Sequence, residues 1–133
     1  MTTSTRPLHW SDLVPSDQLE TFGEFWRELR QLGQRPRALL SGEERRKMDL
    51  LELLLDELVE GFREAIDHVG RASVPGLVVQ AVDAVKDTRD LQRHYRSSLD
   101  PMMRRELPAI ETRADEHVGR LGELLAAAKG GGS

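Results

Sequence analysis

"MDLLELLLDELVEGFREAIDHV", residues 48–69, carries apolar side chains at alternating spacings of three and four residues. This spacing places them in one stripe along one face of an α-helix. Leucines at 50, 53 and 54 and Ile66 widen the stripe beyond what one neighbouring helix covers. The segment therefore predicts a long bundle helix with two neighbours. Its stripe spans three heptads: Met48, Leu51, Leu55, Leu58, Phe62, Ala65 and Val69.

Three other segments have helical periodicity, and their ends carry helix signals. Ser41 and Glu44 form the capping-box pattern of a helix start, and Pro101 is typical of a first helical position. Pro108 should kink or split the last helix, because proline removes a backbone hydrogen bond and crowds the preceding turn. We predict helices at residues 17–32, 42–69, 74–97 and 101–128.

The helices predict an all-α fold, an antiparallel four-helix bundle with an irregular N-terminal arm. The arm comprises residues 1–16 and the bundle residues 17–128. Residues 129–133, KGGGS, are predicted to be a flexible tail or linker, because glycine disfavours a helix.

Composition excludes several classes of function. The formal net charge of −4 argues against nucleic acid as a partner, since binding there depends on neutralising phosphates. The chain contains no cysteine, which excludes disulfides and thiolate metal sites and suits a reducing compartment. No apolar run is long enough to span a bilayer. We expect a cytoplasmic protein without membrane contact, and its arginine-rich composition, with three lysines, resembles that of a high-GC bacterium.

The second predicted helix is strongly acidic. Between Asp49 and Asp67 it has seven carboxylates against one arginine, and most of them fall away from the apolar stripe. They are expected either to form a solvated outer face or to bind a basic partner. Pairing with arginines of the same chain or of a second copy is a further alternative. The candidate partner-binding carboxylates are Glu52, Asp56, Glu57, Glu60 and Glu64.

Two other segments are candidates for contacts. Trp10 and Leu13 lie in the arm, where they are expected either to bind a partner or to fold back onto the bundle end. Arginines also gather around the turn between the third and fourth helices. They form a candidate patch for an anion or an acidic partner, made of Arg89, Arg93, Arg96, Arg104 and Arg105.

The sequence predicts no catalytic residues, no cofactor and no metal site. A di-iron or hemerythrin-like bundle is the alternative, and its ligands would be Glu64, His68, His94 and His117, although no Glu-x-x-His motif occurs. Less specifically, the segment around His94, LQRHYRSSL, resembles histidine phosphotransfer bundles, which carry an exposed helical histidine. That resemblance covers five or six residues and lacks the lysine-glycine pattern of those domains.

The remaining pattern is that of helix packing. Long helices with wide apolar stripes often bury part of the stripe against a partner or a second subunit. We therefore expect a non-catalytic helical interaction protein of the adaptor or scaffold type, acting through helix faces. Its partner is expected to be another protein or itself, as a homodimer.

Overall fold

The computed structural model describes residues 9–97 and 101–130, and the side chains of all of these except 96, 97 and 102–104. Over this part of the chain the protein is all-helical, with four long helices packed together. The elements are α1 (Trp10–Leu13), α2 (Ser16–Gly33), the 3-10 turn η1 (Arg37–Leu39), α3 (Gly42–Val69), the 3-10 turn η2 (Arg71–Ser73), α4 (Gly76–Ser97) and α5 (Pro101–Gly130).

The predicted helix signals act where the sequence places them. Ser41 caps α3 in a capping box, accepting a hydrogen bond from the Glu44 backbone at 3.1 Å while the Glu44 carboxylate accepts one from the Ser41 backbone at 3.0 Å. At its other end α3 stops at Gly70, whose φ of +101° is a conformation that side-chain-bearing residues rarely adopt. Both ends of α3 therefore coincide with the predicted ends.

Three local expectations differ from the structure. The helix α5 continues through Pro108, so of the kink or split predicted there, the split does not occur. It also continues to Gly130, so that the first two residues of the predicted tail are helical. Within the arm, Trp10–Leu13 forms the one-turn helix α1, which His9 caps by accepting a hydrogen bond from the Ser11 backbone.

At two positions in the second half of α3, the core lies one residue beyond the predicted stripe, whereas Phe62 of the stripe is buried. Val59 is 1% exposed and Ile66 is 1% exposed, whereas Leu58 and Ala65 are only partly buried. A straight helix has 3.6 residues per turn, so a strict heptad stripe drifts by about 20° per heptad relative to a fixed neighbour. The buried apolar positions of α3 accordingly follow spacings of 4, 4, 3 and 4 residues: Leu51, Leu55, Val59, Phe62 and Ile66.

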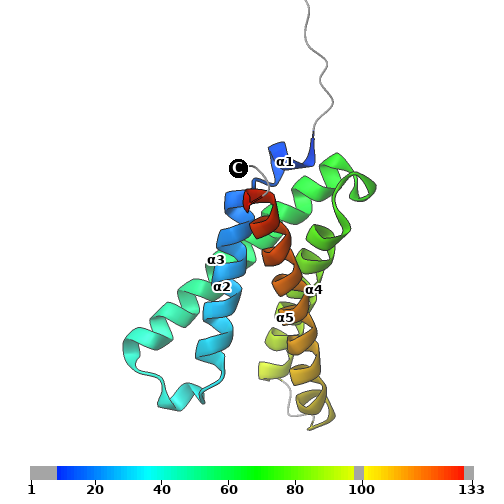
Figure 1. Ribbon diagram of the computed structural model, residues 1–133. Helices are drawn as coiled ribbons and strands as arrows, with labels where there is room; N and C mark the ends of the chain where they lie inside the picture. The colour runs from blue at the N-terminus through cyan, green and yellow to red at the C-terminus, as the bar shows by residue number, and fades with distance from the viewer. Residues whose placement is uncertain (1–8, 98–100, 131–133) are drawn as a thin grey trace, which may run out of the picture.

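Consecutive long helices pack in pairs, α2 with α3 and α4 with α5 (Figure 1). The pairs meet in a core that includes Trp26, and Phe22 of α2 contacts Phe62 of α3 edge-to-face at 5.6 Å between ring centroids. Toward the end of the molecule opposite α1, the two pairs diverge (Figure 1). In the described ranges, no helix combines the length and the apolar character required to cross a membrane.

Candidate functional site

A buried arginine ties α4 to α3. Arg89 is 2% exposed, and its guanidinium donates to Asp56 Oδ1 at 3.0 Å and to Glu52 Oε2 at 2.9 Å. Arg93, one turn further along α4, also pairs with Asp56. Glu52 is 8% exposed, so this carboxylate belongs to the interior and not to the outer face. Two of the predicted partner-binding carboxylates are thus held within the chain.

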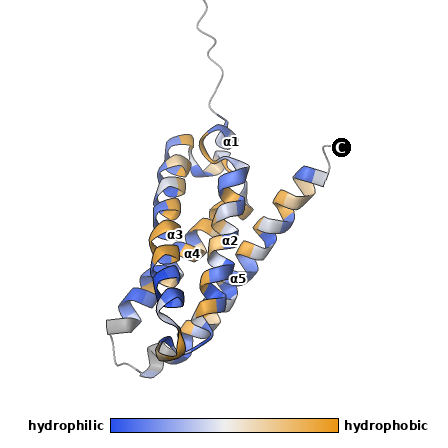
Figure 2. Ribbon diagram, turned by 90° about the vertical axis from the view of Figure 1, so that its left-hand side faces the viewer, coloured by the Kyte–Doolittle hydropathy of each residue, from blue (hydrophilic) through white to orange (hydrophobic). Residues whose placement is uncertain are grey.

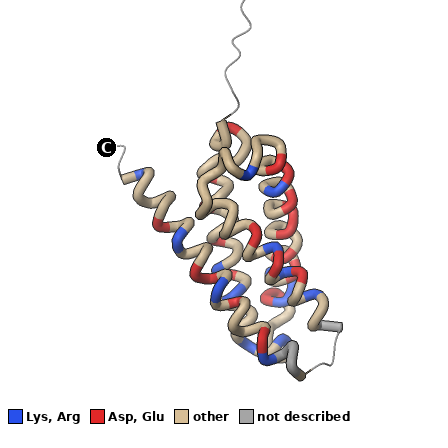
Figure 3. The backbone as a smooth tube through the Cα atoms, turned by 90° about the vertical axis from the view of Figure 1, so that its right-hand side faces the viewer, with Lys and Arg blue, Asp and Glu red and all other residues tan. Residues whose placement is uncertain are grey.

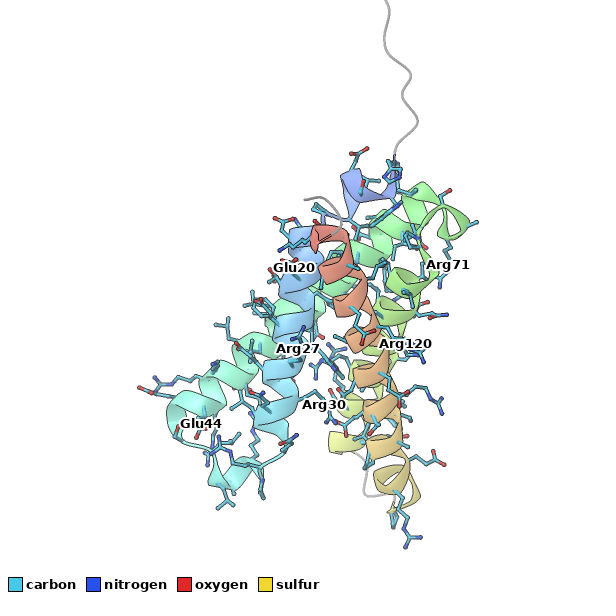
Figure 4. The ribbon with its side chains drawn as sticks, viewed as in Figure 1. Glu20, Arg27, Arg30, Glu44, Arg71 and Arg120 are labelled. Carbon is cyan, nitrogen blue, oxygen red and sulfur yellow. The ribbon has the colours of Figure 1, made fainter. Side chains whose placement is uncertain are left out.

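The same arginine begins a polar network that reaches all four long helices. Its Nη1 donates to Gln92 Oε1 at 2.8 Å, and Gln92 Nε2 donates to Glu111 Oε2 of α5 at 3.0 Å. Glu111 also accepts from Arg30 of α2 at 3.0 Å. Arg30 projects from α2 into the space between the two helix pairs, as Figure 4 shows. The side chains of α3, α4, α5 and α2 are therefore joined in one chain of hydrogen bonds.

The network ends against the core. Asp115 accepts hydrogen bonds from Arg30 Nε at 3.0 Å and from the indole nitrogen of Trp26 at 2.7 Å. Trp26 is 1% exposed, and its N–H needs such a partner because an unpaired buried donor costs about 1–3 kcal/mol. Asp115 thus fixes the orientation of a large core side chain while it pairs with Arg30.

Charge states in the network follow from its pairing. Burial raises the pKa of Asp56, but hydrogen bonds and charges from Arg89 and Arg93 outweigh it and leave the pKa lower than usual. Burial likewise lowers the pKa of Arg89, but the hydrogen bonds and charges of Asp56 and Glu52 raise it above its ordinary value. Both groups stay ionised near neutral pH, so the pair acts as a structural contact and does not exchange a proton.

A cavity of about 260 Å³ lies beside the network, between the diverging helix pairs. Leu29 and Met48 contribute apolar walls, and Arg30, Arg89 and Glu111 contribute the polar ones. Because both arginines already donate to carboxylates, the cavity offers an incoming anion little unmatched positive charge. We therefore assign the network to holding the helices together.

The opposite face of α3 is apolar and exposed. Leu50 is 54% exposed and Leu53 is 57% exposed, in the leucine-rich stretch at residues 50–58. Figure 2 shows this stretch of α3 in orange, with a hydrophilic stretch beneath it. Exposed leucines that stand together, unlike scattered ones, mark candidate contact surfaces.

An apolar groove of about 370 Å³ adjoins these leucines between α2 and α3. Its lining consists of Leu13, Gln18, Thr21, Phe25, Leu54, Glu57, Leu58, Gly61 and Phe62. Leu54 and Glu57 belong both to the groove and to the neighbourhood of Leu50 and Leu53, so the two features form one continuous surface. We call Leu50 and Leu53, together with this groove, the α3 surface.

The remaining predicted carboxylates stand at the edge of the α3 surface and beyond it. Glu57, Glu60 and Glu64 are exposed. None of the three forms an ion pair with another side chain that the structure describes. At the other end of the same face Arg46 is exposed and is equally unpaired among the described side chains.

Trp10 and Leu13 lie partly buried against the hydrophobic core. Since Leu13 also lines the groove, the docked α1 extends the α3 surface at one end of the bundle. Of the two sequence alternatives for the arm, this arrangement matches the folded-back one for residues 10–13. Residues 1–8 lie outside the described residues.

The predicted arginine patch is divided by the fold. Arg89 is buried in its ion pairs, Arg93 is about half exposed and pairs with Asp56 and Asp90, and Arg105 is exposed. The side chains of Arg96 and Arg104 lie outside the described residues. Positive and negative residues alternate along the α4 and α5 side of the molecule (Figure 3).

The alternative metal ligands do not form a described cluster. Glu64 and His68 are exposed on α3, His94 is exposed on α4, and His117 is partly buried on α5. Among the described residues, no group of three His, Cys, Asp or Glu side chains is positioned to hold a metal ion. The buried Nδ1 of His117 has no hydrogen-bond partner, although a groove of about 300 Å³ adjoins it between α4 and α5.

Sequence reasoning missed most of the network. Arg30, Gln92, Glu111 and Asp115 have no motif that singles them out, and each resembles an ordinary residue of a solvated helix face. One signal was present: Trp26 lies in the apolar stripe of its helix and carries an N–H that requires a polar partner on another helix.

No protein-family model, curated protein or solved structure matches this chain. Its function is therefore inferred from the α3 surface and from the polar network on the opposite edge of the same helix.

Proposed function

We propose that this chain is a non-catalytic interaction protein of the adaptor or scaffold type, built as an antiparallel four-helix bundle and working in the cytoplasm. It binds a protein partner, either another protein or a second copy of itself, through the α3 surface. Binding is between folded surfaces and requires no cofactor.

The exposure of Leu50 and Leu53 carries this proposal. Burying a leucine fully is worth about 1.5–3 kcal/mol relative to leaving it exposed, so two half-exposed leucines beside an apolar groove favour an additional contact. The groove provides a concave neighbour into which a partner side chain fits. Together these features give a surface with an apolar centre and a charged rim, as protein interfaces have.

The polar network supports the non-catalytic part of the proposal. Its carboxylates and arginines form a structural connection between the helices, with Arg89 matched to Glu52 and Asp56. On the outer face of α3, apolar area and the charges of Arg46, Glu57, Glu60 and Glu64 remain available. Such groups suit recognition of another surface.

Leu53→Glu tests the proposal. Leu53 is exposed, so the variant should fold like the wild type, but a charge at the centre of the α3 surface should abolish binding. The wild type and the variant are used to recover partners from the native cell at low and at high salt, and light scattering measures the mass of each purified protein. Leu39→Glu is the matched control, because Leu39 is 71% exposed in η1 and lies outside the α3 surface.

We expect the wild type and Leu39→Glu to bind alike and Leu53→Glu to lose its partner or its dimer. Salt should weaken binding in part, because it screens the rim charges. A monomeric wild type whose recovered proteins are the same for all three chains would overturn the proposal.

A further inference from the structure

We propose that the α3 surface takes a second copy of this chain, with the two α3 helices crossing antiparallel about a two-fold axis between Leu50 and Leu53. This inference rests on the proposed function, and it names the partner. Three observations support it: the spacing of the exposed residues along α3, the opposite charges of Arg46 and Glu57 on either side of the two leucines, and the adjacent groove.

Four residues on the exposed face of α3 are arranged symmetrically about the point between Leu50 and Leu53. The inner two are leucines, and the outer two carry opposite charges. Arg46 precedes Leu50 by four residues, Leu53 follows Leu50 by three, and Glu57 follows Leu53 by four. These spacings of 4, 3 and 4 keep the four residues on one helix face. Arg46, Leu50, Leu53 and Glu57 are all exposed.

An antiparallel two-fold axis matches each member of this order with a suitable partner. Leu50 of one chain meets Leu53 of the other, and Arg46 of one chain meets Glu57 of the other. The axis generates every contact twice, as an isologous dimer requires. Since α3 rises by about 1.5 Å per residue, Arg46 and Glu57 lie at equal distances, about 8 Å along the helix, from the axis.

The charges decide the orientation. In a parallel pair, Arg46 would face Arg46 and Glu57 would face Glu57, and like charges across an interface oppose binding. Within α3, the antiparallel pair brings Glu43 against Glu60, and these like charges are exposed at the outer rim, where water and salt screen them. Nor do Arg46 and Glu57 have ion-pair partners among the described side chains of their own chain.

The groove supplies the area that one helix face lacks. The face from Arg46 to Glu57 is roughly 18 Å long and about 10 Å wide, whereas a standard interface buries about 800 Å² on each partner. The second copy must therefore also cover the groove walls, including Leu13 and Phe25. The docked α1 thus becomes part of the interface.

Charge reversal tests the antiparallel pairing. Arg46→Glu places two like-charged contacts in the dimer, and so does Glu57→Arg. Each single variant should raise the dimer dissociation constant about tenfold or more. The double variant Arg46→Glu/Glu57→Arg restores opposite charges and should dimerise close to wild-type strength. Light scattering and sedimentation equilibrium from about 1 to about 100 μM, a range that covers micromolar dimers, provide the dissociation constants.

Mixing the two single variants gives a second readout. A chain with Glu at 46 and Glu at 57 complements a chain with Arg at both positions, so the mixture should form heterodimers although each variant alone is largely monomeric. The controls are Arg120→Glu and Glu116→Arg, which make the same charge changes at exposed positions of α5. Thermal unfolding followed by circular dichroism checks that every variant folds.

Weakened single variants, a restored double variant and heterodimers in the mixture together support the antiparallel dimer. Single variants that dimerise like the wild type would overturn it. In a parallel pair, for example, Arg46→Glu only replaces an Arg46–Arg46 contact by a Glu–Glu contact, so the dissociation constant would not change. A wild type that is monomeric over the whole range, yet recovers another protein in a Leu53-dependent manner, overturns the second copy as partner and leaves the proposed function standing. A monomer whose recovered proteins do not depend on Leu53 overturns both.

Discussion

The two edges of α3 use the same kind of residue in opposite ways. Asp56 and Glu57 are neighbours in the sequence but point about 100° apart around the helix. Asp56 accepts hydrogen bonds from the buried Arg89, whereas Glu57 is exposed and has no ion pair with a described side chain. The carboxylates of α3 therefore have two roles. On the inner edge, which carries Glu52 and Asp56, they connect α3 to α4, and on the outer edge, which carries Glu57 and Glu60, they are charges available to a partner. Three stability measurements separate the edges.

The largest effect is expected from the inner edge. Arg89→Met removes the cation that pairs with the buried Glu52 and leaves Asp56 with Arg93 alone, and breaking a buried pair in this way typically costs about 3–5 kcal/mol. Urea unfolding of the wild type and the variant measures the loss. Adding Glu52→Gln to Arg89→Met removes the buried charge that has lost Arg89 and should recover part of the stability. A loss for Arg89→Met below about 1 kcal/mol, the range of exposed ion pairs, would show that the network is solvated.

The second prediction compares two leucines of α3 and tests how this helix is rotated relative to the core. Leu55 is fully buried while Leu58 is only partly buried and lines the groove, so Leu55→Ala should cost about 2–5 kcal/mol and Leu58→Ala clearly less. Thermal or urea unfolding of the two variants, at concentrations where the chain is monomeric, provides the values. Equal losses would restore the strict heptad stripe that the sequence predicts.

The smallest effect concerns the pH dependence of Asp56. Its pKa is lowered in the folded protein, so its contribution is complete above the unfolded pKa of about 3.9 and is lost as pH falls through the folded-state pKa. The wild type should thus be more stable than Asp56→Asn at pH 7, and this difference should shrink below about pH 4. The free energies of unfolding of both proteins across this range are the measurement.

Glu60→Ala is the matched control on the outer edge. Glu60 is exposed, so its loss should change the stability of the monomer by less than about 0.5 kcal/mol at either pH. A pH-independent difference between wild type and Asp56→Asn, or an equal effect at Glu60, would contradict the assignment of Asp56 to the inner edge.

Helices and their ends were predictable because their causes are local. The capping box at Ser41, the stop at Gly70 and the apolar stripe of α3 each lie within a few residues of the feature they produce. Pro108 was only partly informative: its local preference is to kink or interrupt a helix, but α5, packed against α4 and α2, is not split there.

The sequence alone determined the all-helical class, the four long helices and an acidic, leucine-rich α3. Only the tertiary structure decided which carboxylates of α3 are internal, because that depends on the rotation of α3 relative to α4 and on the position of Arg89, 37 residues away from Glu52. The same holds for the pairing of Arg30 with Glu111 and Asp115. Periodicity locates a stripe on one helix, but its rotation against neighbours is set by side-chain volumes on several helices at once, and those contacts join residues far apart in the chain.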